Sequence, residues 1–76
     1  MLIASVFVRS NEGDILVETL GFEVLPSVDH KLKIAKKDGT GWTDQLFLVR
    51  EIEHAMVSKQ DKPSYAQFIN IYVIRL

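Results

Sequence analysis

The chain ends in FINIYVIRL, residues 68–76, a segment that is apolar on both faces if it is extended. Alternate side chains of a β-strand point to opposite faces. One face would carry Ile69, Ile71 and Val73. The other would carry Phe68, Asn70, Tyr72 and Ile74. A strand at the surface of a small domain has to bury only one face, so the second apolar face needs its own explanation.

The beginning of the chain has the same character, because residues 1–8 read MLIASVFV. If the two terminal strands are neighbours, their outer faces form one contiguous apolar patch, which is unusual on a monomer once it exceeds a few hundred Å². We therefore expect another chain to cover it. The predicted interface residues are Ile3, Phe7, Phe68, Tyr72 and Ile74. If the first strand faces the other way, the outward residues are Leu2, Ala4, Val6 and Val8.

Length and composition indicate a single domain, residues 1–76, that is too small to be very stable alone. The common remedies are disulfides, metals and oligomerisation. The chain has no Cys and only two His, which excludes disulfides and thiolate metal sites. We expect a homo-oligomer without a cofactor, with a different protein partner as the alternative.

Charge is nearly balanced overall but uneven along the chain. The net charge is −1, so no global basic field attracts nucleic acid or an anionic membrane. Residues 1–29 carry one Arg against five acids, and residues 30–41 carry four Lys against one acid. There is no secretory pattern and no apolar stretch of the roughly 18 to 20 residues that a membrane span needs. We expect a cytoplasmic protein.

Three further segments between the ends are long enough for strands. They are Ile15 to Leu25, Lys31 to Lys36 and Trp42 to Val57. Turn-forming residues separate all five segments at 10–14, 26–27, 38–41 and 58–64. In the second segment, Ile15, Val17 and Thr19 alternate on one face, and Gly21 indicates a bulge or bend. In the third, Leu32 and Ile34 point inward.

The fourth segment fits two structures. As a helix over residues 43–57, it would begin at Thr43 and Asp44 and place Ile52 and Met56 at helical spacing. As a strand, it would point Phe47, Val49, Ile52, His54 and Met56 inward, provided that one bulge near Arg50 and Glu51 shifts the register. Short flanking hairpins favour the strand. The sequence thus predicts an all-β protein, a five-stranded antiparallel barrel or strongly bent sheet, with an α+β fold containing a helix at 43–57 as the alternative.

The layout resembles small bacterial and phage barrel proteins of unknown function, some of them encoded on mobile elements such as integron gene cassettes. The resemblance lies in a first hairpin followed by Phe-x-x-x-Pro, then a turn and a short strand, and later a Val-x-x-hydrophobic-x-His strand. The matching residues are Phe22, Pro26, Val28, Leu32, Ile34, Val49, Ile52 and His54. The turn after the proline often carries Gly in these proteins, where this chain has Asp29. The resemblance implies an SH3-like barrel and no particular chemistry.

A basic strand offers a second function. Small barrels bind single-stranded nucleic acid through phosphate contacts and base stacking on aromatic residues. The candidates here are Lys31, Lys33, Lys36, Lys37 and Trp42. The acidic first third and the neutral total argue against strong binding, and Lys on a strand also prevents edge pairing.

A third hypothesis is a small-ligand or enzymatic pocket, formed between subunits and lined by Asp29, Trp42 and His54. The competing interpretation makes Asp29 a turn residue and His54 a strand-end residue. Glu53 and His54 would point to opposite faces of a strand, so they cannot chelate one metal together. No catalytic or metal-ligand motif is present in the pattern.

Overall fold

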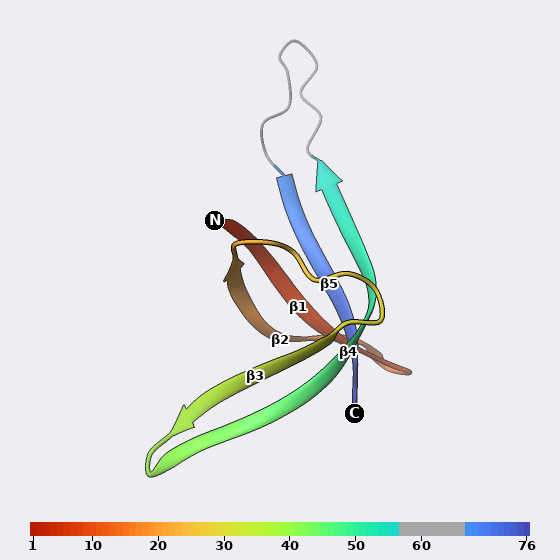
Figure 1. Ribbon diagram of the computed structural model, residues 1–76. Helices are drawn as coiled ribbons and strands as arrows, with labels where there is room; N and C mark the ends of the chain where they lie inside the picture. Colours follow the sequence, from red (N-terminus) through yellow and green to blue (C-terminus); the bar gives the residue numbers. More distant parts are fainter. Residues whose placement is uncertain (57–66) are drawn as a thin grey trace.

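The computed structural model describes residues 1–56 and 67–76, which form one five-stranded sheet (Figure 1). The predicted turn at 58–64 lies outside these residues. The strands are β1 (Leu2–Ser10), β2 (Gly13–Phe22), β3 (Lys31–Asp38), β4 (Gly41–Met56) and β5 (Gln67–Arg75). Their order in the sheet is β2-β1-β5-β4-β3. The described part of the chain contains no helix, so the all-β prediction is confirmed.

The two terminal strands are neighbours at the centre of the sheet, as predicted, but they run parallel. Ala4 pairs with Ile69 and Val8 with Val73, whereas the three other strand pairs are antiparallel. The sheet is therefore mixed, and the prediction of a wholly antiparallel sheet is corrected. The reason is topological: short loops impose antiparallel pairing only on strands that follow one another in sequence, and β1 and β5 do not.

The ambiguous fourth segment is a single long strand over the described residues 41–56, which excludes the helical alternative there. The first half of β4 pairs with β3 and the second half with β5. The register shifts between Val49 and Glu51, so the predicted bulge is present. Phe47 and Val49 are fully buried on one side of this bulge, and Ile52 packs against the core beyond it. His54 and Met56 are exposed, which differs from the inward positions expected of them.

The bulge in β2 lies elsewhere than the sequence indicated. Gly21 pairs regularly with Ile3. The register between β2 and β1 instead shifts at Val17, which is the additional residue of the bulge. A bulge places two successive residues opposite one, so the alternation of faces changes along the strand. As a result Val17 and Leu20 both pack against the core, although simple alternation puts them on opposite faces.

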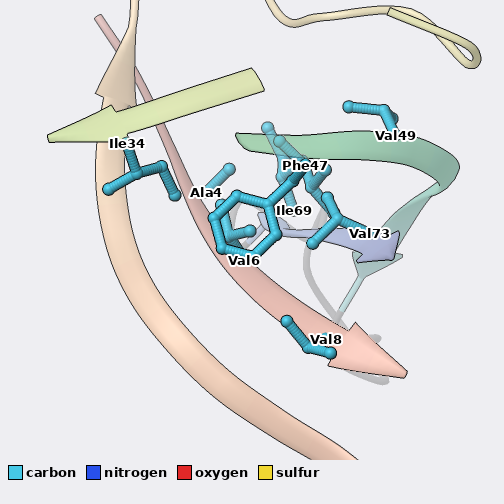
Figure 2. Packing of buried hydrophobic residues seen from close by; sticks show 9 residues of the cluster. Ala4, Val6, Val8, Ile34, Phe47, Val49, Ile69 and Val73 are labelled. Carbon is cyan, nitrogen blue, oxygen red and sulfur yellow. The ribbon is translucent and has the colours of Figure 1, made fainter. Parts of the chain in front are cut away.

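The core lies on one face of the sheet and is built from β1, β3, β4 and β5. Figure 2 shows these side chains converging around Phe47. The buried residues are Ala4, Val6, Val8, Ile34, Phe47, Val49, Ile69, Ile71 and Val73. The sheet curls around them, and β2 adds half-buried side chains at the margin. Because β-branched residues dominate these positions, the core matches the pleated surface that forms it.

The sheet curls into a half-barrel that does not close. The edge strands are β2 and β3, and among the described residues no Cα of one lies within 8 Å of a Cα of the other. Paired strands lie about 4.8 Å apart, so this gap is too wide for a ladder. The Cα radius of gyration is 14.5 Å. A compact domain of this length has about 11 Å, so the half-barrel is unusually extended.

The connection between β2 and β3 ends in a tight turn that is tied to β4. The His30 amide donates to the Ser27 carbonyl at 3.0 Å, and the Asp29 amide donates to the Val49 carbonyl at 2.8 Å. Asp29 has a φ of 71° at the third position of this turn, a conformation that favours glycine.

We expect the Asp29→Ala variant to be less stable than Asp29→Gly by about 1 kcal/mol, because Ala in the left-handed region is strained and Gly is not. Both variants lose the exposed contact of Asp29 with Arg50 at 3.7 Å, so the comparison isolates the backbone. Urea unfolding of the two variants measures the difference. Equal stability would show that this turn carries no strain.

Candidate interaction surface

The face of β1 and β5 that points away from the core is called the outer face here. Ala4, Val6 and Val8 are buried in the core, so Ile3 and Phe7 point outward, as the predicted interface requires. On β5, Ile69, Ile71 and Val73 are buried, which leaves Phe68, Tyr72 and Ile74 outward. The structure thus brings all five predicted interface residues to one face of two adjacent strands. They are called the outer patch below.

The outer patch exposes large apolar side chains at the middle of the sheet. Ile3 and Phe68 are each 57% exposed, and Ile74 is 38% exposed. Phe7 and Tyr72 are register partners, and their rings stack with centroids 5.7 Å apart. Such exposure is common at an edge or a loop, but β1 and β5 are interior strands, each with a neighbouring strand on both sides.

A polar row crosses the outer patch and divides it in two. Ser5 and Asn70 are register partners, and the Ser5 hydroxyl lies 3.4 Å from that of Thr19. On the other side, the Asn70 amide donates to Glu53 at 3.0 Å. The patch is therefore two apolar segments with a hydrogen-bonded row between them. Asn70 alone could be expected there from the sequence, because Ser5 and Thr19 join it only through the registers of β1 with β5 and of β1 with β2.

A shallow hollow of about 350 Å³ opens on the outer face beside the polar row. Its lining residues are Ile3, Ser5, Thr19, Phe68, Ile69 and Asn70. Apolar walls with a few hydroxyl and amide groups are typical of a surface that accepts a side chain from another molecule.

Arg9 borders the other segment of the patch and was missed by the sequence reasoning. Its guanidinium lies 4.4 Å from the centroid of the Tyr72 ring and forms an ion pair with Glu51. The Tyr72 ring therefore contacts both the guanidinium of Arg9 and the ring of Phe7. An arginine over a tyrosine ring is a cation–π contact, which is a common element of protein interfaces. Only the register of three strands brings these residues together.

Glu53 accepts two hydrogen bonds on the outer face. The amide of Asn70 donates at 3.0 Å and the hydroxyl of Tyr72 at 3.2 Å, both to the same carboxylate oxygen. Of these, the bond from Asn70 is the larger cause that lowers the pKa of Glu53. The pKa of Tyr72 is raised, mainly by desolvation and then by its bond to Glu53.

This arrangement predicts a dependence of stability on pH. Because the folded-state pKa of Glu53 is lowered, the hydrogen bonds stabilise the fold above the unfolded-state pKa. Their contribution is lost as the pH falls below that value and through the lowered pKa. We expect the acid-side decline of the unfolding free energy to be smaller in Glu53→Gln than in the natural chain. Urea unfolding at a series of acidic pH values measures the unfolding free energy of both proteins. An equal decline of this free energy in the two proteins would contradict this role of Glu53.

The basic strand presents a mixed surface. Lys31, Lys33 and Lys37 alternate with the buried Ile34, so they share the outer side of β3 with Trp42, the register partner of Lys37. Trp42 is 70% exposed. Lys36 points the other way, toward β2. Lys33 also pairs with Asp44 at 3.2 Å, which reduces the positive charge of this surface.

The three residues of the hypothetical pocket lie apart within the chain. Trp42 and His54 are at opposite ends of β4, and Asp29 sits in the turn beside Val49. A site that uses all three would therefore need a second chain. Among the described residues, no cluster of three or more His, Asp and Glu side chains is placed to hold a metal ion.

The fold defines a small all-β protein, a half-barrel of five strands with its terminal strands paired in parallel at the centre. No family model, curated protein or solved structure matches the chain. No described segment forms a helix with the length and hydropathy to cross a membrane.

Proposed function

We propose that the chain is a self-associating β half-barrel that acts as a binding module, and that a second copy covers the outer patch. The observation that carries the proposal is the exposure of Ile3 and Phe68 on two adjacent interior strands of the sheet, β1 and β5. Central strands have no free edge to protect. Their outer face would be polar in a monomeric barrel, so an apolar one supports burial against another surface.

The energetics of a small open sheet support a second copy as the partner. The chain has no cysteine for a disulfide, and the half-barrel around its core is left open by a gap between β2 and β3. Burial of apolar surface contributes roughly 25 cal/mol per Å². In a symmetric pair the outer patch of each chain is buried against the other chain. The pair therefore has stability that the isolated half-barrel lacks.

Stability that depends on protein concentration tests this proposal. If association stabilises the fold, the urea midpoint rises with protein concentration, because mass action favours the assembled folded state. We expect a clear rise over a hundredfold range of concentration. A midpoint that stays constant over that range would show that the fold does not depend on association.

A second candidate function is the binding of single-stranded nucleic acid on the outer side of β3 and β4. The observation that favours it is the exposed ring of Trp42 beside Lys37, with Lys31 further along the same side. Base stacking on such a ring is worth about 1–3 kcal/mol. Fluorescence anisotropy of a labelled oligonucleotide at low salt tests it, with Trp42→Ala as the comparison. No anisotropy change with the natural chain would remove this candidate.

A further inference from the structure

The open edges of the half-barrel carry opposite charges. On β2, the acidic residues are Asp14 and Glu18, with Glu12 just before the strand and Glu23 just after it. On β3, the basic residues are Lys31, Lys33, Lys36 and Lys37. The remaining three strands separate these two edges, which then face each other across the gap. The sheet thus has one acidic and one basic unpaired edge.

One side chain already crosses the gap. Lys36 lies 3.9 Å from the carboxylate of Glu18 and donates to the main-chain carbonyl of Val17 at 3.4 Å. That carbonyl belongs to the extra residue at the bulge of β2, and it accepts from a side chain of the other edge strand. Lys36 and Glu18 therefore lie at about the same level along the strands, and one main-chain acceptor of β2 is reached from the opposite edge.

We propose that two copies join edge to edge, so that β3 of each half-barrel pairs with β2 of the other at two equivalent seams. The strand directions permit this. Since β3 and β5 both run antiparallel to β4, and β5 runs parallel to β1, β3 runs opposite to β2. A two-fold axis along the strands preserves these directions, so both seams are antiparallel ladders between an acidic and a basic edge.

The two-fold rotation does not change the position of any residue along the axis. Lys36 of one copy therefore lies opposite Glu18 of the other. The ion pair across the gap of one chain is replaced by an equivalent pair between chains, as in an exchange of identical contacts between subunits. Relative to two separate chains, the pair is stabilised by the main-chain hydrogen bonds that form at the two seams. The seams and the outer patch are different surfaces, so this inference does not rest on the proposed function.

Charge reversal on separate chains tests the seams. Both variants are built on Ile3→Thr/Phe68→Thr, a background that removes association through the outer patch. Glu18→Lys places two lysines together at each seam, and Lys36→Glu places two glutamates together, so each variant alone repels a second copy. In an equimolar mixture, a mixed pair has opposite charges at both seams. Contacts within one chain cannot be repaired by mixing.

We expect the background protein and the mixture to have the mass of two chains, and each variant alone the mass of one. Light scattering measures these masses, with circular dichroism to check folding. The proposal is overturned if the background is a single chain, if the variants alone keep the mass of a pair, or if the mixture stays at one chain. The proposed function is judged separately, by whether the natural chain has about twice the mass of the background, so the two proposals can fail independently.

Cysteine cross-linking keeps the proposal testable if a reversed variant does not fold. The natural chain has no cysteine, so Glu18→Cys and Lys36→Cys chains each carry a single thiol. Disulfides need Cα atoms within about 7 Å, a distance that adjacent strands of a seam provide. We expect a mixed disulfide-linked pair on oxidation of the mixture, at a yield well above that of Val24→Cys with Lys36→Cys. Equal yields would overturn the seam.

Discussion

Replacement of Phe47 by Ala is expected to destabilise the fold by about 3–5 kcal/mol. For a small domain this loss is enough to leave most molecules unfolded at room temperature. Phe47 is fully buried, and the core cluster to which it belongs includes residues of β1, β3 and β5 (Figure 2). Removal of the ring leaves a cavity at the place where the two halves of the bent sheet meet. The surrounding strands are held by their ladders, so they cannot close the cavity without losing main-chain hydrogen bonds.

The matched control is Leu46→Ala on the neighbouring residue. Leu46 is 42% exposed on the opposite face of the same strand, so its replacement removes little buried surface. We expect a change of at most about 1 kcal/mol there, typical of a partly exposed position. Circular dichroism during urea unfolding measures both. A Phe47→Ala protein as stable as the Leu46→Ala protein would show that the core is not organised around this ring.

The double variant Ile3→Thr/Phe68→Thr is expected to halve the mass of the natural assembly in solution without unfolding the chain. Both side chains are more than half exposed within one chain, and Thr keeps a high preference for strands. In a symmetric pair the two substitutions occur twice. With about 1 kcal/mol or more lost at each buried site, we expect the dissociation constant to rise at least about a hundredfold.

The control for this variant is Val24→Thr/Val28→Thr. These two valines are 81% and 50% exposed, but they lie in the connection between β2 and β3. Loss of exposed hydrophobicity is thus similar in the two double variants, and only the location differs. Light scattering should show the natural mass for this control. A mass that falls in both variants, or in neither, would contradict the assignment of the interface to the outer patch.

Much of the fold could be predicted from local patterns. The period-2 alternation of Ile69, Ile71 and Val73 identified both the strand and its buried face, because burial acts on one face of a strand at a time. The bulge in β4 could also be predicted, since the apolar positions change parity between Val49 and Ile52. The inward position of Leu32 and Ile34 followed from the lysines between and around them.

Features that depend on non-local pairing could not be predicted. The parallel register of β1 and β5 is set by how the whole chain returns to its starting strand, and no residue near either strand encodes it. The bulge at Val17 has no glycine to mark it, whereas Gly21 suggested one where the ladder is regular. The contacts of Arg9 with Tyr72 and Glu51 join three strands, so they appear only when the register is known.

The mass of the natural chain in solution tests the central claim most directly. Sedimentation equilibrium over a range of concentrations distinguishes one chain of 8.7 kDa from an assembly. If the outer patch is covered by a second copy, the mass is at least twice that of one chain and falls toward it only on dilution. A folded protein with the mass of one chain at every concentration would contradict the account.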